Sequence, residues 1–201
     1  MPKTLRPRRV IAIAAIILAL IPFAVPSRAV IPVQGASVKD WNPRSFWYEP
    51  WGRSGVHKGI DIFSPRGRPV LSATYGVVVF NGTLGLGGNA VAVLGPKWRI
   101  HYYAHLERAN VQSLMVGPGS KIGSVGTSGN AAGKPPHLHY AVLSLIPRPW
   151  QVTGGTQGWK RMFFVDPGAG LVAAQQRVLP DVAAVRSLLQ SERSVGRQHS
   201  G

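Results

Sequence analysis

The chain has 201 residues, with 23 Lys and Arg against 7 Asp and Glu, a formal net charge of +16 at pH 7 and no cysteine. The lack of cysteine excludes disulfide bonds and an N-terminal lipid-bearing cysteine, and it leaves histidine and carboxylate side chains to bind any metal ion. So basic a surface attracts polyanions. The basic residues are scattered and no nucleic-acid-binding motif occurs, so nucleic acid is not an expected partner.

Residues 1–29 have the pattern of an export signal. A basic start precedes an apolar run of 16 residues, Val10–Val25, and small residues precede a cleavage point after Ala29. The run is shorter than the roughly 20 residues that span a bilayer as a helix. We therefore expect a signal peptide, with an uncleaved signal anchor as the alternative. Beyond residue 29 the chain keeps a net charge of +11.

Residues 30–52 form an aromatic-rich lead-in to the rest of the chain. Five rings occur within eleven residues of this segment: Trp41, Phe46, Trp47, Tyr48 and Trp51. We expect most of them to pack as a plug against a sheet, with one or two lining a groove.

Short apolar segments separated by Gly, Pro, Asn or Ser predict an antiparallel β-sheet or sandwich. The predicted strands are Pro69–Ser72, Gly76–Phe80, Ala90–Leu94, Arg99–Ala104, Lys121–Val125 and His137–Leu143. Turns are predicted at Asn81-Gly82, Gly87-Gly88-Asn89 and Gly117-Pro118-Gly119.

Two segments follow the predicted strands. Residues 146–160 are rich in Pro and Gly and predict a loop, which would form a wall of a cleft. After Pro180, the spacing of Val182, Val185 and Leu188 predicts a short amphipathic helix that ends in a basic, polar tail.

Four histidines and an aspartate carry donor atoms suited to a catalytic zinc site. If residues 137–143 form a strand, His137, His139 and Ala141 point to one face. The same alternation over residues 100–105 predicts that His101, Tyr103 and His105 share a face.

His57 and Asp61 belong to this group only if the backbone bends between them. Four residues of straight strand span about 13 Å, too far for two ligands that each lie about 2 Å from one ion. Gly59 is the residue expected to permit the bend.

These motifs in this order resemble the lysostaphin-type, or LytM-like, zinc metallopeptidases, which cleave peptide cross-links in bacterial cell walls. The resemblance extends over about Arg53 to Leu143, with a weaker match at residues 164–167. It rests on His57-Lys58-Gly59-Ile60-Asp61-Ile62, Tyr103-Ala104-His105-Leu106, Gly123-Ser124-Val125-Gly126-Thr127-Ser128-Gly129 and Pro136-His137-Leu138-His139-Tyr140.

The resemblance implies a mainly β fold, an antiparallel sheet or sandwich of the lysostaphin type (duplicated hybrid motif) with a short C-terminal helix. The implied peptidase domain is residues 53–168, followed by a helix and basic tail at 169–201. One zinc ion would be bound by His57, Asp61 and His139, with water as the fourth ligand. His105 and His137 would be catalytic, one as the base and one as a hydrogen-bond donor; which is which stays open.

The implied function is a zinc endopeptidase that acts on peptidoglycan peptides in the periplasm or cell envelope, either free or anchored to the inner membrane. Anionic wall polymers or a membrane surface are further expected partners; the oligomeric state is not predicted. The alternative is a non-catalytic relative that binds wall material or activates another hydrolase, although such relatives typically lose the metal ligands. Ala141 stands where the family commonly has an acidic residue, so a carboxylate supporting a ligand is absent.

Overall fold

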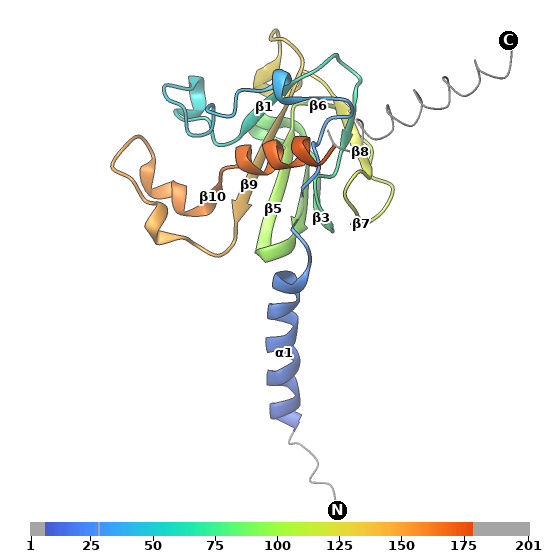
Figure 1. The fold of residues 1–201 in the computed structure, drawn as a ribbon, viewed down its shortest axis with the longest axis vertical. Helices are drawn as coiled ribbons and strands as arrows, with labels where there is room; N and C mark the ends of the chain where they lie inside the picture. The colour runs from blue at the N-terminus through green and yellow to red at the C-terminus, as the bar shows by residue number, and fades with distance from the viewer. Residues whose placement is uncertain (1–6, 28, 179–201) are drawn as a thin grey trace, which may run out of the picture.

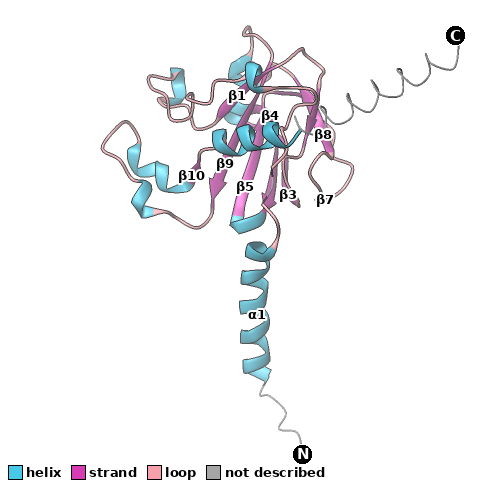
Figure 2. Ribbon diagram, viewed as in Figure 1, coloured by secondary structure: helices cyan, strands magenta, loops and turns pink. Residues whose placement is uncertain are grey.

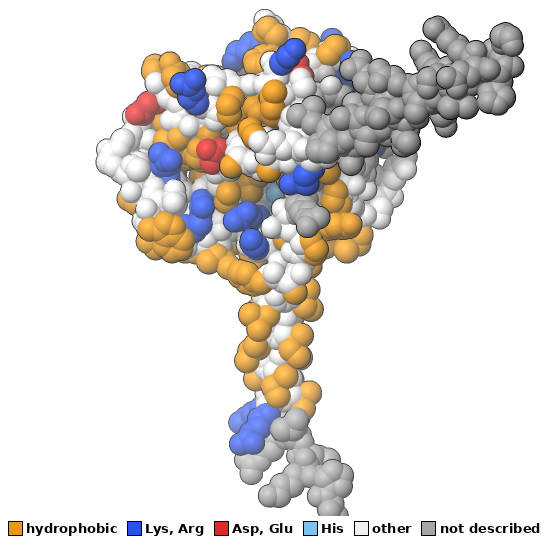
Figure 3. All heavy atoms as spheres, viewed as in Figure 1, with side chains coloured by type: hydrophobic (Ala, Val, Ile, Leu, Met, Phe, Trp, Pro, Cys, Tyr) orange, Lys and Arg blue, Asp and Glu red, His pale blue; other side chains and the backbone are white. Residues whose placement is uncertain are grey.

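The computed structural model describes residues 7–27 and 29–178. An N-terminal helix, α1 (Pro7–Ala24), projects from a β-rich domain (Figure 1). Its side chains are mostly exposed and apolar, with basic residues at the end far from the domain (Figure 3). The Trp98 indole N–H donates to the Ala19 carbonyl at 2.9 Å and joins the helix to the domain. None of the helices in the described ranges is both long and apolar enough to cross a membrane.

The domain contains two antiparallel sheets (Figure 2). The larger sheet has the strand order β1-β9-β5-β4-β3-β7, with β10 beside β9, and the smaller has the order β2-β8-β6. The strands are β1 (Ile60–Phe63), β2 (Pro69–Leu71), β3 (Gly76–Leu84), β4 (Gly88–Gly95), β5 (Arg99–Ala104), β6 (Leu106–Ala109), β7 (Met115–Val116), β8 (Lys121–Val125), β9 (His137–Ser144) and β10 (Phe164–Val165). The prediction of a mainly antiparallel β fold is confirmed.

Short 3-10 helices occupy the connections. They are η1 (Val38–Asp40), η2 (Gly52–Ser54), η3 (Gly85–Gly87), η4 (Pro96–Trp98), η5 (Gly129–Ala131), η6 (Pro149–Gln151) and η7 (Gly158–Phe163). Residues 146–160 lie in the connection between β9 and β10, which contains η6 and the start of η7. The sequence predicted a loop here.

One predicted turn is wrong. Asn81 and Gly82 lie inside β3, paired with Val91 and Ala90, and the chain reverses only at η3. The alternation of the β3/β4 hairpin continues past Asn-Gly, so cross-strand pairing outweighs the local turn preference. The turn predicted at Gly117-Pro118-Gly119 is confirmed, with the Ser120 N–H donating to the Gly117 carbonyl at 3.0 Å.

The core lies between the two sheets and is closed at one side by the aromatic lead-in. Val70 and Ile122 from the smaller sheet join Leu138 from the larger one in a single buried cluster. Trp41 is buried in this cluster and Phe46 packs against it, so two of the five rings, rather than most of them, form the predicted plug.

Both ends of the described domain are fixed to its body. The Val30 N–H donates to the Ala73 carbonyl at 3.0 Å, and the Ala29 carbonyl accepts from Arg177. Residues 168–178 are helical, and Leu171 is fully buried. The helix predicted after Pro180 lies outside the described residues.

A buried histidine makes the stability of the domain dependent on pH. His101 is 8 % exposed, with Nδ1 2.7 Å from the Tyr140 hydroxyl. Burial, with a smaller contribution from Arg99, lowers the pKa of His101 from 6.5 to about 4. Between these pH values the unfolded chain binds more protons than the folded one, so stability is lost as the pH falls.

We expect His101 alone to remove on the order of 3 kcal/mol from the free energy of unfolding between pH 7 and pH 4. Urea denaturation across this range measures the loss. His101→Asn keeps a polar atom near Tyr140 but does not titrate, so it should flatten the pH dependence. An unchanged slope in this variant would contradict the assignment.

Candidate metal centre

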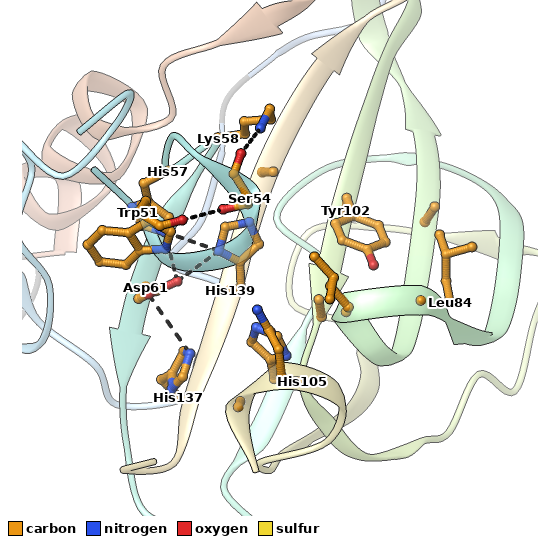
Figure 4. A pocket seen from close by; sticks show the side chains of 18 of the residues that line it. Trp51, Ser54, His57, Lys58, Asp61, Leu84, Tyr102, His105, His137 and His139 are labelled. Carbon is orange, nitrogen blue, oxygen red and sulfur yellow. Dashed lines mark hydrogen bonds and ion pairs between the residues drawn. The ribbon is translucent and has the colours of Figure 1, made fainter. Parts of the chain in front are cut away.

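The pairing of β1 with β9 brings Asp61 and His139 together. The two residues are direct partners in the register, and both line the groove on the face of the larger sheet opposite the core. The Asp61 Oδ1 lies 2.8 Å from the His139 Nδ1 and 3.0 Å from the His57 Nε2, and the two imidazole nitrogens are 3.2 Å apart. Figure 4 shows these three side chains converging from neighbouring segments.

The bend between His57 and Asp61 is confirmed, and it places Gly59 against β9. A Cβ atom on Gly59 would lie 2.5 Å from the Tyr140 carbonyl oxygen and 2.9 Å from the His139 ring. Glycine is needed here because of this close approach, since any side chain would push the His57 segment away from its partners.

Each of the three residues offers one donor atom to a common point. The His57 Nδ1 lies 3.0 Å from the Ser45 carbonyl oxygen, which can only accept, so Nδ1 carries the proton and Nε2 has a free lone pair. His139 presents Nδ1, and all three donor atoms lie within 4.8 Å of one another. Ligands about 2.0–2.1 Å from one tetrahedral zinc lie about 3.3 Å apart. The donor set therefore fits a single zinc ion.

Asp61 is held in its ionised form. Burial raises the pKa of its carboxyl group, but the close approach of the His139 and His57 imidazoles lowers it by more, so the net pKa lies well below its usual value. An ionised carboxylate is the form that binds a metal ion.

The backbone of His105 is left-handed, and its side chain lines the groove. Strand β5 ends at Ala104, and His105 has φ 63°. The prediction that His101, Tyr103 and His105 share a face is therefore wrong. His101 and Tyr103 point into the core, where the Tyr103 hydroxyl accepts from the Ala73 N–H at 2.8 Å, whereas His105 lines the groove. The reversal of φ breaks the alternation of the strand at this residue.

His105 and His137 face each other beside the three candidate ligands, with ring centroids 5.0 Å apart. The His105 Nδ1 donates to the Ser128 carbonyl at 2.9 Å, and the His137 Nδ1 donates to the Pro135 carbonyl at 2.8 Å. Each ring thus keeps a free Nε2 lone pair. Burial first, then His139 and His137, lowers the pKa of His105 to about 4, so this imidazole is neutral near pH 7. All five residues singled out in the sequence are brought together.

The sequence of the domain matches a known family over residues 55–147, the Peptidase family M23. This part of the chain belongs to that family. The resemblance to lysostaphin-type peptidases, drawn from the three histidine motifs, is confirmed.

Two curated relatives and one solved structure illustrate the match. The chain is 41% identical over 113 residues to the L-Ala–D-Glu endopeptidase of Bacillus subtilis (strain 168), covering 51% of this chain and 35% of the relative. It is 40% identical over 85 residues to the DD-carboxypeptidase/endopeptidase Mpg of Neisseria meningitidis, covering 42% and 19%. The chain thus spans about a third or less of these relatives. Lysostaphin from Staphylococcus simulans shares the fold, with a TM-score of 0.54 and 24% identity, over 73% of this chain and 56% of that one.

The groove of the M23 domain has a volume of about 960 Å³ and a largely apolar floor beyond the three candidate ligands. Trp51, from the lead-in, forms one wall and stacks on His57 with ring centroids 4.1 Å apart. None of the residues 146–160 lines this groove, so the loop is not the cleft wall that the sequence suggested. The floor includes Val79, Phe80, Leu84, Ile100, Tyr102, Leu143 and Phe164.

One supporting contact of the M23 site was not identified from the sequence. The Ser128 carbonyl that orients His105 is placed by a close approach of two glycines: a Cβ on Gly129 would lie 2.4 Å from the Gly88 nitrogen and 2.3 Å from the Leu86 carbonyl oxygen. The Ser128 hydroxyl also accepts from the Asn89 N–H at 2.9 Å. Gly129, the last glycine of the Gly123–Gly129 motif, was the sequence signal for this contact.

We expect Gly129→Ala to displace Ser128, misorient His105 and lower turnover, while metal content is kept. Gly133→Ala is the matched control, because Gly133 has a similar φ of 77° but nothing within 4 Å of an added Cβ. The control should cost only about 1–2 kcal/mol of backbone strain. Thermal denaturation and turnover measure the two effects. Equal turnover in both variants would show that the close approach does not position His105.

Proposed function

We propose that this chain is a zinc-dependent metalloendopeptidase that hydrolyses peptide cross-links of bacterial peptidoglycan. The observation that carries the proposal is the arrangement of five side chains: three donor atoms converge on one point, and two imidazoles with free Nε2 atoms stand beside it. The names of the two curated relatives, both endopeptidases, support the same activity.

In this proposal the metal ligands are the His57 Nε2, an Asp61 carboxylate oxygen and the His139 Nδ1. When bound, zinc lowers the pKa of a coordinated water to near 7 and polarises the substrate carbonyl. His105 and His137 supply the general base and the hydrogen-bond donor to the oxyanion. One Nε2 accepts the proton of the attacking water, and the other ring, in its protonated imidazolium form, donates from Nε2 to the developing oxyanion. The accepted proton then passes to the leaving amine.

The Nδ1 hydrogen bonds fix the orientation of the two imidazole rings. Each ring is fixed by a backbone carbonyl rather than by a carboxylate, so the tautomer with a free Nε2 is held without adding negative charge beside the scissile bond. Asp61 is the one acidic side chain among the described residues that line the groove.

Removal of the metal should separate this proposal from the non-catalytic alternative. We expect the purified full chain to bind one zinc per molecule and to release muropeptides from peptidoglycan sacculi. A chelator should abolish release, and added zinc should restore it. Release that persists without metal would contradict the mechanism. A zinc-loaded protein that binds sacculi without cleaving them would favour the alternative.

We also propose that the chain is exported to the periplasm or cell envelope. The basic start, the apolar run and the small residues before position 30 support export. The net charge of +11 beyond residue 29 supports attraction to anionic wall polymers or to a membrane surface.

A further inference from the structure

A small hollow opens from the side of the groove next to the metal ligands. It has a volume of about 250 Å³ and is lined by Trp51, Gly52, Arg53, Ser54, Asn130 and Lys134. Four of these residues also line the groove, so the hollow and the groove are continuous. Whole small-molecule sites measure about 300–1,000 Å³, so the hollow suits a single amino-acid residue of a longer bound peptide.

The two sides of the hollow carry positive charges from segments far apart in the sequence. Arg53 lies in η2, before His57, and Lys134 lies just before His137; both side chains are exposed. In the described ranges, neither side chain forms an ion pair with a carboxylate, and no acidic residue lines the hollow. The pair is therefore available to an anionic ligand.

The wall nearest the metal centre is rigid. The Trp51 N–H donates to the Gly55 carbonyl at 2.9 Å, and the Ser54 hydroxyl donates to the Trp51 carbonyl at 3.0 Å. The indole ring stacks on His57, as Figure 4 shows. The hollow therefore shares its Trp51 wall with the groove that contains His57.

A third cation adds to the positive field at the same wall. The Lys58 ammonium group donates to the Ser54 carbonyl at 3.0 Å, behind the turn that carries Trp51. The carboxylate of Asp61 is already engaged by His57 and His139, so it does not neutralise the hollow.

We propose that this hollow is a subsite for a carboxylate-bearing residue of the peptide substrate, bound between Arg53 and Lys134. The guanidinium group gives paired donors to the carboxylate, the ammonium group adds a charge-assisted hydrogen bond, and the indole face covers the aliphatic part of the residue. The inference rests on the proposed peptidase function and adds a preference: peptides acidic at this position are cleaved before neutral ones.

The test compares two muropeptides that differ in one group. In one the glutamyl α-carboxyl is free, and in the other it is amidated. With the zinc-loaded full chain we expect kcat/KM to be about 10–100-fold higher for the acidic peptide, mainly through KM. The ratio between the two peptides should fall about tenfold or more in Lys134→Met and in Arg53→Met. It should be kept in Lys121→Met, which removes an exposed charge from β8 in the smaller sheet.

A ratio near one in the wild-type chain, or a ratio unchanged in both hollow variants, would overturn the inference while leaving the peptidase proposal intact. If neither peptide is cleaved, the peptidase proposal fails, and calorimetric binding of the same two peptides to the zinc-loaded chain decides the subsite separately. A preference in affinity for the acidic peptide that Lys134→Met removes supports the subsite, and equal affinities reject it.

Discussion

His139→Ala is expected to abolish zinc binding, whereas His137→Ala keeps the metal and loses turnover. The His139 Nδ1 is one of three atoms that converge on a common point, so its removal leaves two ligands and should weaken zinc binding by more than about a hundredfold. The His137 Nδ1 is occupied by the Pro135 carbonyl, and its Nε2 lies 3.9 Å from the nearer Asp61 oxygen. Its loss should lower kcat by about 10²–10⁴-fold.

Metal analysis after dialysis and muropeptide release by the zinc-reconstituted variants measure the two effects. His101→Asn is a suitable control for general damage, because His101 lies in the core rather than in the groove. Equal loss of zinc in His137→Ala and His139→Ala would show that the roles of the two histidines in β9 are assigned wrongly.

His105→Ala is expected to lower kcat by about 10²–10⁴-fold with zinc content unchanged. His105→Asn is the informative companion, because asparagine tolerates the left-handed backbone at φ 63° and remains a hydrogen-bond donor but cannot accept a proton as a base. If His105→Asn is as inactive as His105→Ala, His105 is the base. If His105→Asn recovers a substantial part of kcat, His105 is the donor to the oxyanion. Full activity of His105→Ala would remove His105 from the mechanism.

The candidate site was predictable from the sequence to the extent that it follows strand alternation. The shared face of His137, His139 and Ala141 depends only on the period of β9, and all three residues line the groove. The approach of His57 to Asp61 followed from the distance limits of metal binding, with Gly59 as the marker of the bend. The roles of these residues as ligands or catalysts stay predictions.

What the sequence could not supply are the features set by long-range packing. The residues Tyr103-Ala104-His105 do not indicate that φ becomes positive at the histidine. The sign changes because the chain leaves the larger sheet after β5 and enters the smaller one at β6. The prediction of a turn at Asn81-Gly82 was wrong for a related reason, because pairing with β4 extends β3 beyond these two residues. The stacking of Trp51 on His57 and the approach of Gly129 to Gly88 also join distant segments.

If the chain is exported as proposed, the attachment of residues 29 and 30 to the domain constrains when the expected cleavage after Ala29 takes place. The peptide bond after Ala29 lies between a carbonyl that accepts from Arg177 and an N–H that donates to Ala73. A leader peptidase requires an extended, accessible segment, so scission at this bond has to precede folding of the polypeptide around it. A molecule that folded first would have both polar groups of this bond engaged and would keep α1, so the relative speeds of the proposed processing and of folding would set the share of molecules that retain the helix.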